Sequence, residues 1–98
     1  MATYVTTIRF TEQGLQGIRD TGKRASSFKA AAEKMGVKVS AIYWTLGAFD
    51  GLLIYDAPDD AAATAAMLQL ASQGNVQTTT SRAFNSSEME KIVGALQK

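Results

Sequence analysis

The fold is decided by residues 37–55, VKVSAIYWTLGAFDGLLIY, because this stretch predicts two apolar strands joined by a short turn. The turn GAFDG contains two glycines and an aspartate, which suit a tight hairpin. The short, fully apolar strand after it is typical of a central position in a sheet. The strand before the turn carries apolar groups in both parities: Val37, Val39, Ala41 and Tyr43 on one face, Ile42, Trp44 and Leu46 on the other. We therefore expect neither face of this strand to be freely exposed to water.

The segment before the hairpin predicts a strand and a helix. Residues 3–10 alternate polar and apolar side chains with the period of two expected of a strand. The next ten residues contain two glycines and predict a turn or short irregular helix, with Leu15 and Ile18 as anchors. Thr21 can cap the following helix, and Gly36 supplies a left-handed stop. The stripe expected to face the sheet is Ala25, Phe28, Ala32 and Met35.

The segment after the hairpin repeats this order. Asp59 can cap a helix that Gly74 ends, with Ala63, Ala66, Met67 and Leu70 as its apolar stripe. Residues 76–84 are rich in threonine and predict a strand at a sheet edge. Ser87 and Glu90 have the spacing of a capping box for a last helix. That helix carries the stripe Met89, Ile92, Val93 and Leu96.

The element order predicts one α+β domain over residues 1–98 with a ferredoxin-like fold. Strand, helix, strand, strand, helix, strand is the split βαβ arrangement, with an antiparallel sheet ordered 4-1-3-2, helices on one face and an additional C-terminal helix. The opposite face would be open in a lone chain, yet its middle strands are apolar. We expect a second copy to cover it and form a homodimer, because two-fold homodimers are the commonest assembly. The alternative is that the last helix folds across this face.

Composition excludes several classes of function. Ten Lys and Arg against nine Asp and Glu give a net charge of +1, so no basic surface for nucleic acid is expected. The chain has no cysteine and no histidine, which removes thiol chemistry and the usual zinc and haem ligands, and leaves tyrosine as a possible haem ligand. No cofactor is expected. The N-terminus lacks a signal-peptide pattern and no segment is apolar enough to cross a membrane, so we expect a cytoplasmic protein.

Two motifs lie on either side of the third predicted strand: Gly47-Ala48-Phe49-Asp50 before it and Asp56-Ala57-Pro58-Asp59-Asp60 after it. They resemble the motifs of the GYD family, with Phe49 in the position of the family's tyrosine. The resemblance extends over nearly the whole chain. It implies a ferredoxin-like domain of the dimeric α+β barrel group, and it implies no settled biochemical activity.

The predicted sheet groups polar residues that are distant in sequence. We take strand three as parallel to strand one and strand four as antiparallel to it. Two clusters are then expected at opposite ends of the sheet: Asp50 with Tyr4 and Arg82, and Arg9 with Tyr55 and Asp56. An arginine facing a carboxylate is often a purely structural pair.

The same clusters also suggest a ligand site. Arg82 or Arg9 would hold a small anionic ligand in a cavity between two sheets. The apolar wall would come from Tyr43, Trp44 or Tyr55. As an alternative, large aromatic residues of this kind are plain core. Asp59 and Asp60 are explained by helix capping, so no metal site is expected.

Two hypotheses for function follow. The first is a homo-oligomeric module that binds a small molecule or a protein partner through the sheet-side cavity or its rim. The second is a cofactor-free enzyme, an oxygenase or isomerase, with Asp50 or Asp56 as base and Arg9 or Arg82 stabilising negative charge. The enzyme hypothesis predicts a carboxylate and an arginine converging on empty space, whereas the first predicts that they touch each other.

Overall fold

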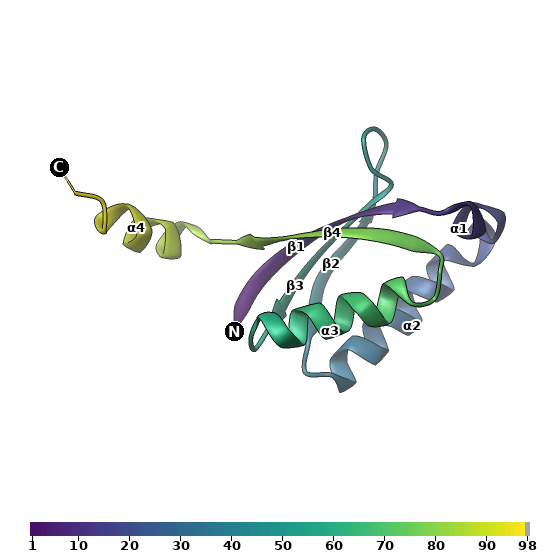
Figure 1. The fold of residues 1–98 in the computed structure, drawn as a ribbon, viewed down its shortest axis with the longest axis horizontal. Helices are drawn as coiled ribbons and strands as arrows, with labels where there is room; N and C mark the ends of the chain where they lie inside the picture. Colours follow the sequence, from purple (N-terminus) through teal and green to yellow (C-terminus); the bar gives the residue numbers. More distant parts are fainter. Residues whose placement is uncertain (98) are drawn as a thin grey trace.

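The computed structural model describes residues 1–97. The elements are β1 (Ala2–Phe10), α1 (Glu12–Gln16), η1 (Ile18–Asp20), α2 (Thr21–Lys34), β2 (Lys38–Trp44), β3 (Gly51–Ala57), α3 (Asp60–Ala71), β4 (Val76–Ala83) and α4 (Ser86–Gly94). The four strands form one antiparallel sheet in the order β2-β3-β1-β4, with α2 and α3 on one face (Figure 1). This confirms the predicted ferredoxin-like α+β fold, its strand order and its C-terminal helix.

The core lies between the sheet and the two helices. Alternate residues of β1 and β3 face the helices, because side chains along a strand point to opposite sides. The buried apolar residues are Tyr4, Phe28, Ala32, Val37, Val39, Leu53, Tyr55, Ala57, Ala63, Ala66 and Met67. The helical stripes predicted for α2 and α3 supply five of them, whereas Met35 at the end of α2 is exposed.

Several helix ends match the sequence, and others do not. Gly36 and Gly74 adopt the left-handed conformation, with φ of 80° and 82°, and Asp59 accepts a hydrogen bond from the Ala62 amide. The prediction that Thr21 caps α2 is wrong, because η1 precedes it and Thr21 is already helical. The capping box of α4 is Asn85 with Glu88, not the predicted Ser87 with Glu90, so α4 begins earlier.

The segment between β1 and α2 is held by a close backbone contact. Leu15 and Ile18, the predicted anchors, are exposed, and Gly14 is buried instead. A Cβ atom at Gly14 would lie 2.1 Å from the Asn75 carbonyl oxygen. That oxygen also accepts a hydrogen bond from the Thr11 amide. The glycine therefore permits α1 to pack against the start of β4.

An irregularity in β2 changes which residues share a face. The pairing with β3 shifts between Val39 and Ala41, so Ser40 is an extra residue in the strand. Val39 and Ile42 pair with the helix-facing Tyr55 and Leu53. The predicted grouping of Val39 with Tyr43 is therefore wrong. Trp44 is on the helix side, whereas Ala41 and Tyr43 are on the open face.

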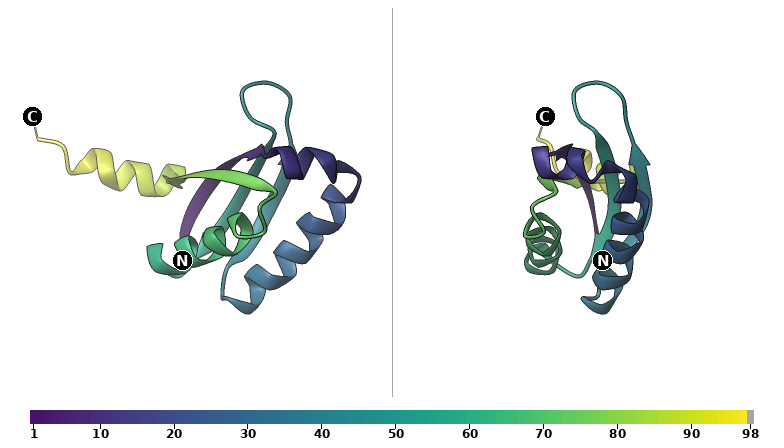
Figure 2. Two further views of the ribbon diagram at one scale, coloured as in Figure 1. Left: turned by 45° about the vertical axis from the view of Figure 1, so that its right-hand side comes forward. Right: turned by 90° about the vertical axis from the view of Figure 1, so that its right-hand side faces the viewer.

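Helix α4 projects away from the rest of the chain. Figures 1 and 2 show it beyond the end of β4, apart from α2 and α3. The radius of gyration is 15.0 Å, whereas a compact chain of this length has about 13 Å. The apolar residues Met89, Ile92, Val93 and Leu96 are all exposed. The helix therefore does not cover the open face of its own sheet, contrary to the alternative considered from the sequence.

Candidate functional site

The two predicted residue clusters are wrong, because β3 runs antiparallel to β1. In the observed register Tyr4 pairs with Tyr55, and Thr3 with Asp56. The end of the sheet predicted to hold Asp50 therefore holds Tyr55 and Asp56, beside Arg82 on the neighbouring β4. Asp50 lies at the opposite end, beside Arg9 and Phe10. The grouping treated strand three as parallel, which an all-antiparallel sheet excludes.

Neither predicted carboxylate pairs with an arginine. Asp50 accepts a hydrogen bond from the Phe10 amide at 2.9 Å, and its own amide donates to the Ile8 carbonyl, so it ties the hairpin to β1. Asp56 accepts from the Thr3 hydroxyl at 2.6 Å. Arg9 donates to the Ala48 carbonyl at 2.8 Å. The contact between carboxylate and arginine that the binding-module hypothesis predicts is therefore not formed within residues 1–97. The two candidate bases of the enzyme hypothesis are engaged in local hydrogen bonds.

Arg82 belongs to a polar cluster at the edge of the sheet. Its guanidinium lies 5.6 Å from the ring centre of Tyr4 and 4.6 Å from that of Phe84, and it forms a 3.7 Å ion pair with Glu88. The Tyr4 hydroxyl donates to the Asp60 carboxylate at 2.5 Å. This hydrogen bond, then desolvation, raises the pKa of Tyr4 above its usual value. The cluster joins β1, β4 and the starts of α3 and α4.

Tyr55 is a core residue in this chain. Its side chain is fully buried, its ring stacks on Tyr4 with centres 5.6 Å apart, and its hydroxyl lies 3.1 Å from the hydroxyl of Thr6. Thr6, also fully buried, is within 2.7 Å of the Thr80 hydroxyl. The ring of Tyr55 is therefore enclosed between the sheet and the helices and has no free face within the chain.

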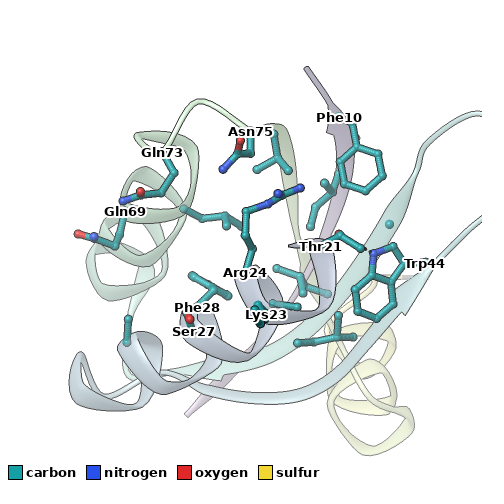
Figure 3. A pocket seen from close by; sticks show the side chains of 18 of the residues that line it. Phe10, Thr21, Lys23, Arg24, Ser27, Phe28, Trp44, Gln69, Gln73 and Asn75 are labelled. Carbon is teal, nitrogen blue, oxygen red and sulfur yellow. Dashed lines mark hydrogen bonds between the residues drawn. The ribbon is translucent and has the colours of Figure 1, made fainter. Parts of the chain in front are cut away.

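A cavity of about 400 Å³ lies on the helix side of the sheet, between α2 and α3 (Figure 3). Its floor is apolar and comes from the sheet: Ile8, Phe10, Ile42, Trp44, Leu53 and Val76. Phe28 and Leu70 extend the apolar surface onto the two helices. The indole Nε1 of Trp44 donates to the Thr21 hydroxyl at 3.0 Å, which holds the ring at the rim. We term this cavity the interhelix groove.

The charged residues of the interhelix groove are all basic. Lys23 and Arg24 line it, and no Asp or Glu does so within residues 1–97. Arg24 is half-buried and donates to the carbonyls of Gly17 at 2.6 Å and Gly14 at 3.3 Å. Sequence reasoning missed this residue, because its position depends on the irregular α1–η1 connection. The available signal was a cationic side chain on the sheet-facing side of a helix for which the sequence predicted no role.

Within residues 1–97, no helix covers the opposite face of the sheet, and the centre of this face is apolar. Val5, Leu52 and Ile54 occupy the positions of β1 and β3 that point away from α2 and α3 and are partly exposed. Tyr43 is 58% exposed on the adjoining strand. We term the surface of Val5, Ala41, Tyr43, Leu52 and Ile54 the open face. Arg9 is at one end of it, and Asp56 with Lys38 is at the other.

Within residues 1–97, no three Asp or Glu side chains come together as metal ligands would. In the same part of the chain, every helix is too short or too polar to cross a membrane.

The sheet order and the two helices on one face define a ferredoxin-like α+β domain. The chain belongs to the GYD domain family, whose model matches residues 4–93. It is also similar to a protein of Thermus thermophilus named "Glutamine synthetase and cystathionine beta-lyase binding protein". The two are 33% identical over 85 residues, which cover 86% of this chain and 90% of the relative.

Proposed function

We propose that this chain is a homo-oligomeric protein-binding module. The observation that carries the proposal is that two apolar surfaces, the open face and the stripe of α4, remain exposed to solvent although the chain already has its own core. Apolar surface gains free energy when it leaves water, by about 25 cal/mol per Å². A second copy covers the open face, and a protein partner contacts α4.

The charges around the open face favour a second copy as its occupant. Arg9 is at one end of the apolar centre and Asp56 is at the other. A two-fold axis in the interface, perpendicular to the strands, reverses the strand direction of the second sheet. Arg9 of each copy then lies opposite the end of the other copy's face that carries Asp56 and Lys38, and two sheets pack about 10 Å apart in such an arrangement. This arrangement lets Arg9 of one copy approach Asp56 of the other.

Helix α4 has the properties of a helix that docks into a groove of a partner. Asn85 and Glu88 satisfy its first backbone amides reciprocally, so the helix is capped without help from a neighbouring element. Its exposed residues Met89, Ile92 and Val93 recur at helical spacing. Amphipathic helices bind protein grooves through such anchors.

The Thermus relative supports a protein as the partner. That protein is named for binding two enzymes, and it matches most of this chain. We propose the same class of partner here, namely an enzyme of the glutamine synthetase or cystathionine beta-lyase kind. A non-catalytic role fits the engagement of Asp50 and Asp56 in local hydrogen bonds.

A titration of purified partner enzymes tests the proposal. The host organism's glutamine synthetase and cystathionine beta-lyase are each titrated with this chain by calorimetry, using wild type, Ile92→Gln and Glu90→Gln. Ile92 is in the apolar stripe of α4, whereas Glu90 is on its other side. Burial of one isoleucine contributes about 1.5–3 kcal/mol, so Ile92→Gln is expected to weaken binding about tenfold or more.

The control variant introduces the same glutamine two positions away and is expected to bind as wild type does. Equal binding by the two variants would show that α4 is not the docking element. No heat of binding with either enzyme would refute this class of partner.

A further inference from the structure

We propose that the interhelix groove binds a small organic anion with a flat apolar body, such as an aromatic carboxylate or sulfonate, and that Arg24 binds its acidic group. The inference does not depend on the proposed protein partner. The open face and α4 lie elsewhere on the molecule and do not line the groove, Tyr43 excepted. A small molecule could therefore bind while a protein is bound.

The size and lining of the groove suit a small organic ligand. Its volume of about 400 Å³ falls within the roughly 300–1,000 Å³ of ligand pockets. Phe10, Phe28 and Trp44 supply aromatic rings from the sheet and from α2. Trp44 is 50% exposed, so its ring can gain further burial against a ligand. Flat apolar bodies stack favourably on such rings.

Charge complementarity specifies an anion. Arg24 forms no ion pair within residues 1–97, and the groove contributes no acidic lining residue there. A half-buried cation without a counter-ion favours an anionic ligand, because desolvation strengthens the attraction between opposite charges. The contacts of Arg24 with the carbonyls of Gly14 and Gly17 hold the guanidinium in place. Its position is therefore set before a ligand arrives.

Polar groups on the far side of the groove can orient the ligand. Gln69 lines the groove from α3 and Gln73 from the turn after it, opposite Arg24 on α2 (Figure 3). Their side-chain amides form no hydrogen bond with residues 1–97. Each amide offers both donors and an acceptor. The groove thus combines an apolar floor, a fixed cation and free amides.

A pair of dyes that differ by one charge tests the proposal. Anilinonaphthalene sulfonate has a flat aromatic body with an acidic group, and N-phenylnaphthylamine has the same rings without it. Both are titrated into the full chain while the fluorescence of Trp44 is followed. Trp44 is the single tryptophan of the chain and lies at the groove, so its quenching reports binding there. We expect the sulfonate to bind about tenfold more tightly.

Two variants locate the source of this preference. Arg24→Gln is expected to weaken the sulfonate about tenfold, or roughly 1.4 kcal/mol, and to leave the neutral dye within about twofold of wild type. Arg9→Gln removes an equal charge from the other side of the sheet and is expected to change neither dye. A greater loss in Arg9→Gln than in Arg24→Gln would place the dye on the open face and overturn the proposal.

Two other outcomes would also overturn it. Equal affinity of wild type for both dyes would show that the groove has no anion preference. Failure of both dyes to quench Trp44 would show that another segment, such as α4 of a second copy, fills the groove. If Arg24→Gln also weakens binding of the neutral dye, the salt dependence of dye binding to wild type shows whether the sulfonate is held by charge. The proposal requires sulfonate binding to weaken with added salt while neutral binding stays constant.

Discussion

Replacing Thr6 with valine removes a hydroxyl from the most deeply buried polar contact of the fold. Valine has nearly the shape of threonine, so packing is preserved while the Thr6 oxygen, 3.1 Å from the Tyr55 hydroxyl, is lost. Both side chains are fully buried, so water cannot replace the missing partner. An unsatisfied buried hydroxyl costs about 1–3 kcal/mol. For a chain of this size, each kcal/mol lowers the melting temperature by about 4–8 °C.

A second substitution tests whether this contact is the cause. Tyr55→Phe alone leaves Thr6 bonded to Thr80 and is expected to cost about 0.5–1.5 kcal/mol. In the double variant neither buried hydroxyl remains, and Thr80, which also loses its contact with Thr6, is exposed and can bond to water. The cost of the double variant should therefore be at least about 1 kcal/mol below the sum of the two single costs.

Urea unfolding followed by circular dichroism measures all four proteins at one fixed concentration, because oligomer stability depends on concentration. Strict additivity of the two substitutions would refute the assignment of Thr6 as the partner of Tyr55. A negligible cost of Thr6→Val would show that Tyr55 is solvated, and would return it to the role of a ligand-facing residue.

Two other predictions concern stability. Because the pKa of Tyr4 is raised in the folded chain, its contribution is complete below about pH 10 and is lost as pH rises through the folded pKa. Tyr4→Phe should therefore flatten the alkaline fall in melting temperature, and an unchanged profile would contradict the Asp60 hydrogen bond. Gly14→Ala places a Cβ atom 2.1 Å from the Asn75 oxygen and should cost about 1–3 kcal/mol. Gly22→Ala, which meets open space in α2, should instead stabilise by up to about 1 kcal/mol; equal effects would refute the close contact.

The element order and the helix stops could be read from the sequence because they depend on local chemistry. Gly36 takes the left-handed conformation directly after the C-cap of α2, Gly74 takes it in the turn after α3, and Asp59 caps α3. Face assignments in β2 failed because the extra residue at Ser40 leaves no mark in the alternating pattern. One inserted residue moves every later side chain to the other face.

The candidate site was less accessible from the sequence. The grouping of Asp50 with Arg82 failed through one wrong strand direction, which exchanged the two ends of β3. Arg24 could not be placed, because its position follows from the carbonyls that α1 and η1 present to it. Trp44 was identified as a candidate wall residue, and it does line a cavity, but on the helix side of the sheet.

Sedimentation velocity on wild type and Ile54→Glu tests the central claim most directly, namely that the open face is sealed by a second copy. Ile54 is at the centre of that face and points away from the chain's own core. The account predicts that wild type sediments with at least twice the 10.5 kDa of one chain, and that Ile54→Glu sediments as a folded single chain. If wild type sediments as a folded single chain, as Ile54→Glu does at the same concentration, the claim is contradicted.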